Sequence, residues 1–171
     1  MPRIPFADPA TLTPEFQKLL AVKHPLNLYR MLPRLGPAAS SGFVALGGAL
    51  LRDGKLDPVL REVAILRVGH ISKASYEVHQ HTRIGRKVGM SDALLAAVKE
   101  GAGASSLTPR EALVIRYTDD VVSNVKAGDA LFGDVVKAFG EDQAAELTMV
   151  IGFYMMVCRF LENTEIPIET A

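Results

Sequence analysis

Hydrophobic positions along the chain recur at helical spacing, and almost no stretch alternates with the two-residue period of a strand. Residues 1–13 are rich in proline and are predicted to form an extended arm on the surface. The pattern predicts a single all-α domain over residues 1–171, a bundle of seven to nine helices. The predicted helices span roughly 14–21, 26–32, 37–52, 58–71, 75–89, 92–101, 108–125, 129–139 and 142–161.

Several of these boundaries rest on particular capping residues. Asp57, which a proline follows, offers a side chain that accepts the free N–H groups of a helix start. Thr108 and Glu111 have the spacing of a capping box. Ser75 is predicted to cap the helix that Gly89 ends, since the left-handed position after a helix favours glycine.

The helix that Gly89 ends carries ionisable groups on the face that should point into the core. Its stripe runs through residues 77, 81, 84 and 88, where Ile84 and Val88 are apolar but Glu77 and His81 are not. Burying an unpaired carboxylate or imidazole costs on the order of several kcal/mol. A chain accepts that cost where the groups have a function, so we predict the functional site here.

Glu62 lies on the preceding helix, which a short link joins to the helix of Glu77 and His81. The two helices are therefore predicted to form an antiparallel hairpin that brings all three side chains to one small polar pocket. A histidine titrates near neutral pH, and a neighbouring carboxylate fixes its tautomer and raises its basicity. The trio favours proton transfer as its chemistry. A buried hydrogen-bond network or interface ion pair without catalytic duty is the alternative.

Other histidines and tyrosines add weaker candidates. His79 points to another face of its helix and no third ligand has metal-site spacing, so no metal is expected. His70 is predicted to lie either at the rim of the pocket or in solvent, and the sequence favours neither position. His24 is expected in a surface loop. Tyr76 and Tyr154 are candidates for hydrogen bonds into the pocket, although core packing explains them equally well.

Charge and cysteine content narrow the function by exclusion. Nineteen basic and nineteen acidic residues give a formal net charge of zero, and no basic stripe stands out, so nucleic acid and membranes are not expected as partners. The single cysteine, Cys158, excludes an intrachain disulfide and a two-cysteine redox motif; it is expected to be buried and inert. No glycine-rich loop follows a strand, so no nucleotide, flavin or other cofactor is expected.

Apolar segments indicate the compartment and the assembly. The N-terminal region has no run of signal-peptide length, and residues 147–158 fall short of the ~20 needed to span a bilayer, so a cytoplasmic protein is predicted. The last helix is apolar on all sides and must be buried on more than one of them. Coverage by another subunit is favoured over a central position in a monomer, so a homo-oligomer is predicted.

Three segments carry a family resemblance: LREVAILRV at 60–68, YEVHQH at 76–81 and IGRKVGMS at 84–91. They closely resemble the carboxymuconolactone decarboxylase family, which includes the alkylhydroperoxidase D-like proteins. The resemblance covers about residues 37–165. It implies an all-α fold of that type, often assembled into trimers or hexamers, with the pocket at or near a subunit boundary.

The peroxidase branch of this family carries Cys-x-x-Cys-x-x-x-His, with a glutamate twelve residues before the first cysteine. Glu62 and His81 match that glutamate and that histidine, but Ala74 and Glu77 stand at the two cysteine positions. Disulfide exchange needs a thiolate nucleophile and a resolving partner. A thiol-dependent peroxidase is therefore disfavoured, although it is kept as an alternative.

The remaining motif resembles the decarboxylase-like branch, which keeps Tyr-Glu and the histidine. It implies that a small carboxylated lactone or keto acid loses carbon dioxide without a cofactor, after which the dienolate is protonated. His81 is expected to donate that proton, with Glu62 or Glu77 setting its tautomer. The dedicated decarboxylases are typically shorter and lack this N-terminal extension, which leaves the substrate open. A non-catalytic oligomeric protein that binds a small ligand is a further alternative.

The substrate implied by this resemblance is a carboxylate, so a cation should hold it. Arg83, Arg67 and Arg159 are the candidates, and Arg83 is taken as the substrate-binding residue together with Tyr76 and His70.

Overall fold

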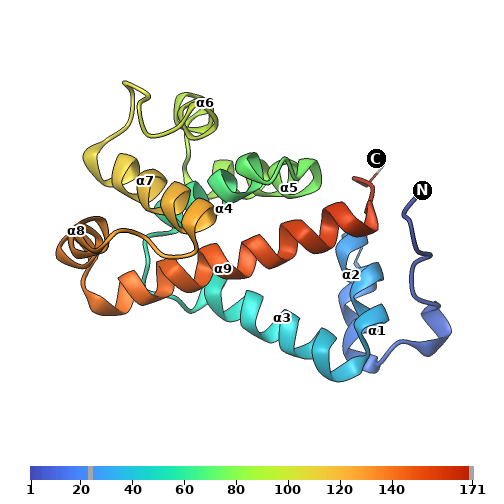
Figure 1. The fold of residues 1–171 in the computed structure, drawn as a ribbon. Helices are drawn as coiled ribbons and strands as arrows, with labels where there is room; N and C mark the ends of the chain where they lie inside the picture. The colour runs from blue at the N-terminus through green and yellow to red at the C-terminus, as the bar shows by residue number, and fades with distance from the viewer. Residues whose placement is uncertain (23–24, 170–171) are drawn as a thin grey trace.

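The structure is a computed structural model that describes residues 1–22 and 25–169. These residues form nine α-helices and two 3-10 helices, with no strand among them (Figure 1). The predicted His24 loop lies outside the described residues. The α-helices are α1 Pro14–Leu20, α2 Asn27–Met31, α3 Pro37–Arg52, α4 Pro58–Ile71, α5 Ser75–Val88, α6 Asp92–Glu100, α7 Pro109–Asn124, α8 Asp129–Phe139 and α9 Glu141–Thr164; the 3-10 helices are η1 Pro9–Thr11 and η2 Leu32–Leu35.

The N-terminal arm differs in part from its prediction. It contains the 3-10 turn η1, so it is not extended throughout. The backbone N–H of Arg3 donates to the carbonyl of Thr164 at 2.9 Å, and that of Ala7 donates to the carbonyl of Arg30 at 3.1 Å. These bonds fasten the arm to the end of α9 and to α2, and Figure 1 shows the arm and the end of α9 on the same side of the molecule.

Helix α4 is central to the core, because it packs against α5, α7 and α9. Its side chains at Val63, Ala64, Ile65 and Val68 are completely buried. Figure 1 shows α9 crossing the middle of the molecule, with α3 on one side and the α4–α5 hairpin on the other. The site residues on α4 and α5 are therefore carried by the most enclosed part of the fold.

Most of the predicted caps are present. The Asp57 side chain accepts the N–H groups of Val59 and Leu60 at 2.9 and 3.1 Å. Thr108 and Glu111 form the predicted capping box, and Gly89 ends α5 with a φ of 108°.

The prediction that Ser75 caps α5 is wrong. Ser75 is the first residue of the helix, the cap position is Ala74, and no side chain among the described residues caps this end. The reason lies in the short link from α4. The N–H of Ala74 donates back to the carbonyl of Gly69 at 2.9 Å and closes the end of α4. This turn leaves Ala74, which has no polar side chain, at the cap position of α5.

Replacing Asp57 with alanine tests the start of α4. The variant is expected to lower the free energy of unfolding by about 1–2 kcal/mol, because two N–H groups lose their acceptor. Urea denaturation measures the loss. Asp53→Ala, at the exposed end of α3, is the matched control and should change stability by less than ~0.5 kcal/mol. Equal losses in the two variants would contradict this role of Asp57.

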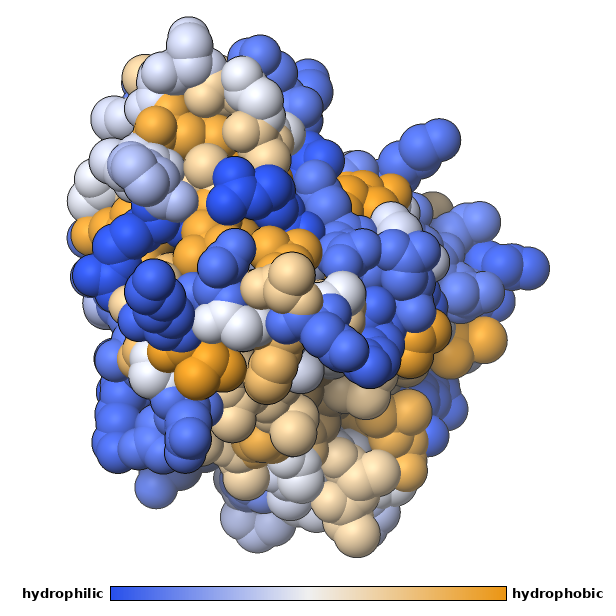
Figure 2. Space-filling model, turned by 60° about the vertical axis from the view of Figure 1, so that its left-hand side comes forward, coloured by the Kyte–Doolittle hydropathy of each residue, from blue (hydrophilic) through white to orange (hydrophobic). Residues whose placement is uncertain are grey.

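Helix α9 is longer than predicted, and in the described chain it is the one helix with the length and composition of a membrane span. Half of that apolar window is buried inside the protein. Met149 and Met156, by contrast, are 53% and 48% exposed. Figure 2 shows hydrophobic patches among hydrophilic side chains on one face of the surface. Coverage of the exposed stripe of α9 by a second subunit stays a prediction.

Candidate functional site

The site is built on the hairpin of α4 and α5. The two helices touch closely at Gly69, where an added Cβ would lie 3.0 Å from Cγ2 of Val78. This close approach turns one face of α4 directly toward α5. The predicted hairpin is present, and it brings Glu62 next to His81.

Glu62, Glu77 and His81 form one buried network. His81 Nδ1 lies 2.7 Å from Oε2 of Glu62, and His81 Nε2 lies 3.1 Å from Oε1 of Glu77. The three residues are 1%, 3% and 6% exposed. Both ring nitrogens therefore face a carboxylate oxygen in a region that water barely reaches.

Two opposing effects set the pKa of His81. Burial lowers it, because the charged ring is poorly solvated there. The charge of Glu77 and the contacts with both glutamates outweigh burial and raise the pKa from 6.5 to about 10. The ring is then an imidazolium at neutral pH. With both carboxylates ionised, the network carries one net negative charge.

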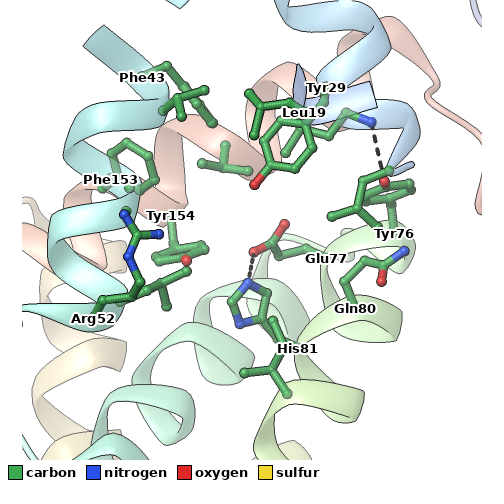
Figure 3. Close-up of a pocket in the computed structure, with 18 residues that line it drawn as sticks. Leu19, Tyr29, Phe43, Arg52, Tyr76, Glu77, Gln80, His81, Phe153 and Tyr154 are labelled. Atoms are coloured by element: carbon green, nitrogen blue, oxygen red, sulfur yellow. Dashed lines mark hydrogen bonds and ion pairs between the residues drawn. The ribbon is translucent and has the colours of Figure 1, made fainter. Parts of the chain in front are cut away.

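The network borders a small cavity of about 180 Å³. Figure 3 shows the Glu77 carboxylate pointing toward the middle of this space, with the His81 ring below it. Oε1 of Glu77 is buried and makes no hydrogen bond within the described residues, so its 3.1 Å contact with His81 is an ion pair of unfavourable angle. The cavity is also lined by Leu19, Leu26, Leu28, Tyr29, Phe43, Val44, Gly47, Gly48, Leu51, Arg52, Tyr76, Gln80, Ile84, Phe153, Tyr154 and Val157.

Two tyrosines supply neutral hydroxyl groups to this cavity. The Tyr154 ring meets His81 edge to face, with the ring centroids 4.9 Å apart. Burial, followed by the charges of Glu77 and Glu62, raises the pKa of Tyr154, and burial likewise raises that of Tyr29. Both phenols keep their protons at neutral pH and can donate hydrogen bonds to a ligand oxygen.

Tyr76 and Gln80 form a wall between the cavity and the C-terminal tail. The Tyr76 hydroxyl donates to Oε1 of Glu169 at 2.6 Å and accepts from the N–H of Leu28 at 3.2 Å. The Gln80 side chain donates to Oε2 of Glu169 at 2.5 Å. The same carboxylate accepts the N–H of Asn27 at 2.5 Å. Tyr76 thus lines the cavity with its ring, while the tail occupies its hydroxyl.

Replacing Glu169 with glutamine tests this tail contact. We expect a loss of about 1 kcal/mol in the free energy of unfolding at pH 7, since the half-exposed carboxylate makes three charge-assisted bonds. Burial alone would raise the pKa of Glu169, but its hydrogen bonds lower it below 4.5. The contribution of Glu169 to the free energy of unfolding is therefore present above pH 4.5, and it is lost as the pH falls through the folded-state pKa of this carboxyl group.

Urea denaturation at pH 7 and at pH 3 measures both effects of Glu169. Glu162→Gln, on the exposed side of α9, is the control and should match the wild type at both pH values. A Glu169→Gln variant as stable as the wild type at pH 7 would show that the tail contact adds nothing.

The cations predicted to hold a substrate lie outside the cavity. Arg83 is exposed and its guanidinium reaches back to Oε1 of Gln80 at 3.4 Å. Arg67 pairs with Asp119 through bonds of 2.5 and 3.0 Å. Arg159 is exposed and donates to a backbone carbonyl of its own helix. Arg83 does not line the cavity, because its place on α5 turns it toward solvent. Its role in substrate binding stays a prediction.

His70 is also absent from the cavity lining. It is half-buried near the end of α4, and its pKa is lowered by burial and then by the charges of Lys99 and Arg67. It faces the α6 side of the molecule, whereas the cavity lies on the α3 side of the hairpin. The prediction that His70 binds substrate is therefore not supported by its position.

Sequence reasoning missed Arg52, the arginine that does line the cavity. Arg52 ends α3, and its guanidinium lies against Gly48, one helical turn earlier. Figure 3 shows it beside Phe153 and Tyr154, across the cavity from Glu77. The signal in the sequence is weak: two adjacent glycines on a helix, with an arginine four residues after the second.

Cysteine and metal chemistry find little support near the cavity. Cys158 is completely buried, and burial followed by the charge of Glu77 raises the pKa of its thiol to about 12. In the described part of the chain, no three His, Cys, Asp or Glu side chains are arranged to share a metal ion. His81 itself has both nitrogens engaged by glutamates.

The fold and site define an all-helical protein with a buried Glu–His–Glu proton network beside a small cavity. A family comparison matches residues 37–120 to the carboxymuconolactone decarboxylase family. This region is similar to the family that its motifs had suggested. A comparison with curated proteins gave no significant match.

Solved structures share the fold at low sequence identity. An uncharacterized peroxidase-related protein from Ralstonia eutropha, with an alkylhydroperoxidase AhpD core, is 19% identical at a TM-score of 0.84, covering 98% of this chain and 92% of its own. An uncharacterized peroxidase-related protein from Silicibacter is 18% identical with a TM-score of 0.80, and the alignment covers 98% of this chain and 91% of that protein. A protein of unknown function from Agrobacterium tumefaciens is 18% identical with a TM-score of 0.73, and the alignment covers 81% of this chain and 96% of that protein. These likenesses confirm the predicted AhpD-like fold.

Proposed function

We propose that the protein is a cofactor-independent lyase that removes carbon dioxide from a small carboxylated lactone or related keto acid. The observation that carries the proposal is the buried His81, which is paired on both nitrogens and joined to a cavity by Glu77. The match of residues 37–120 to the carboxymuconolactone decarboxylase family supports the reaction class. The cavity of about 180 Å³ favours a small substrate, since pockets for drug-sized ligands are roughly 300–1,000 Å³.

In the proposed reaction, the bond between the substrate carboxylate and its carbon breaks. The electron pair moves into the conjugated system as a dienolate, and carbon dioxide leaves. One proton must then be added to carbon. Both ring nitrogens of His81 face carboxylates, so in this scheme the imidazolium passes its proton to Glu77, and Glu77 delivers it to the substrate. The sequence had favoured direct donation by His81.

The other residues have positioning roles in this scheme. Glu62 accepts the Nδ1–H of His81 at 2.7 Å and fixes the orientation of the ring. The neutral hydroxyls of Tyr29 and Tyr154 are suited to stabilising the enolate oxygen, because a hydrogen-bond donor aimed at developing negative charge lowers the barrier. Solvent then returns a proton to the network, and the net reaction consumes one proton and releases one carbon dioxide.

The experiment that tests the proposal is carbon dioxide release from 4-carboxymuconolactone and from a panel of related lactone and keto acids. Wild type, His81→Ala and the exposed His79→Ala are compared, after circular dichroism has shown that each variant is folded. We expect turnover in the wild type and in His79→Ala, and its loss in His81→Ala. No release from any substrate by the folded wild type would reject the lyase.

The alternatives predict different results. A thiol-dependent peroxidase would consume peroxide with a dithiol reductant, but the buried Cys158, with its raised pKa, is a poor nucleophile. A non-catalytic ligand-binding protein would show changes in stability or assembly in Glu77→Gln and His81→Ala, without turnover of any substrate by the wild type.

A further inference from the structure

We propose that Arg52 and the glycine surface at Gly48 form a binding subsite for a carboxylate group, at the side of the cavity opposite Glu77. The inference deepens the proposed function, since it assigns the place where a carboxylate of the substrate binds. Arg52 lines the cavity and is itself exposed, so it lies where the cavity meets solvent. A ligand that enters the cavity from that side meets Arg52 first.

No acidic side chain of the described residues pairs with the charge of Arg52. Other basic side chains near acids are paired, as in Arg67 with Asp119, and Arg86 with Asp92 at 2.9 Å. Across residues 1–22 and 25–169, no ion pair or hydrogen bond engages the Arg52 guanidinium. Its five N–H donors are free, and the planar guanidinium binds a carboxylate through two parallel bonds.

The guanidinium of Arg52 lies against the backbone of α3 at Gly48. A Cβ added at Gly48 would lie 3.0 Å from both Cζ and Nη1 of Arg52, so any side chain there would displace the group. At Gly47 an added Cβ would lie 3.0 Å from Cζ of Phe153. The two glycines thus admit a cation and an aromatic ring side by side, which suits a flat conjugated acid.

The charges on the two sides of the cavity determine how a charged ligand is oriented in it. The network of Glu62, His81 and Glu77 carries one net negative charge when both carboxylates are ionised, and Arg52 carries one positive charge. A carboxylate is therefore attracted to the Arg52 side and repelled from Glu77. The carboxylate held at Arg52 is then a group that stays on the molecule, and the reacting carbon lies nearer Glu77. The expected substrate carries one retained acid group on a small, flat framework.

Binding of 2-furoate and of its neutral analogue 2-furamide tests the subsite without any turnover. Isothermal titration calorimetry compares the two ligands in wild type, Arg52→Gln and Arg83→Gln. Arg83→Gln is the matched control, because it removes an exposed arginine outside the cavity. We expect the wild type and Arg83→Gln to prefer 2-furoate by about tenfold, and Arg52→Gln to lose that preference. The factor is modest because Arg52 is exposed and water screens its charge.

A second variant, Gly48→Ala, keeps the positive charge of Arg52 but changes its position. Gly48→Ala should reduce the preference for 2-furoate as Arg52→Gln does, because the added methyl displaces the guanidinium. Equal binding of 2-furoate and 2-furamide by the wild type, including no binding of either, overturns the subsite, as does a preference that survives Arg52→Gln. A preference that depends on Arg52 in a protein that releases no carbon dioxide would support the subsite and reject the lyase.

Discussion

Replacing His81 with glutamine is expected to lower the free energy of unfolding by about 3–5 kcal/mol near pH 7, because it removes the cation from two buried carboxylates. Glutamine fills much of the same volume, so lost packing accounts for little of this effect. Urea denaturation at pH 7 measures the change. His79→Gln, on the exposed side of the same helix, is the control and should lie within ~0.5 kcal/mol of the wild type.

The pH dependence of stability identifies the cause of that loss. The folded-state pKa of His81 is raised from 6.5 to about 10, so its contribution is complete below pH 6.5 and is lost as the pH rises toward 10. The wild-type free energy of unfolding should therefore fall across this window, and that of His81→Gln should fall less. Parallel curves for the two proteins would show that His81 is not an imidazolium in the folded state.

Replacing Glu77 with glutamine is expected to lower the pKa of His81 by roughly 1–3 units, because an adjacent opposite charge is removed while burial still disfavours the imidazolium. NMR titration of the ring nitrogens measures this shift directly. If the protein is the proposed lyase, the same variant should lose roughly 10²–10⁴-fold in kcat, the usual contribution of a general acid.

Glu100→Gln provides the control for the Glu77 experiment, since Glu100 is exposed at the end of α6. It should leave both the pKa of His81 and the turnover at the wild-type values. An unchanged pKa of His81 in Glu77→Gln would mean that the charge of Glu77, at 3.1 Å from the ring, does not stabilise the imidazolium. A lowered pKa with unchanged turnover would leave the network intact as a structure but remove Glu77 from the proposed reaction.

The features that the sequence predicted well are those that depend on neighbouring residues. Helix starts such as Asp57 and Thr108 are determined by capping side chains within one turn. The pair Glu77 and His81 is fixed by the four-residue spacing of a helix. Glu62 could be added to them because a short link between two helices favours an antiparallel hairpin.

The features that the sequence missed depend on contacts between distant segments. Arg52 faces the cavity because α3 packs beside α9, and the hydroxyl of Tyr76 is occupied because a residue 93 positions later folds back onto it. Arg83 was a reasonable candidate by its nearness to His81 in sequence. On a helix, however, two residues of separation place a side chain on a different face, and Arg83 is exposed.

Tyr76 and Gln80 belong to both the cavity wall and the contact with the C-terminal tail, so we expect the two to be thermodynamically linked. Tyr76 lines the cavity and its hydroxyl donates to Glu169, so a ligand that held the Tyr76 ring in this position would favour the contact with Glu169. By reciprocity, docking of the tail must favour that ligand by the same factor. Filling the cavity should therefore slow proteolysis of the segment 165–169, and anything that captures this segment should weaken binding in a cavity that it never touches.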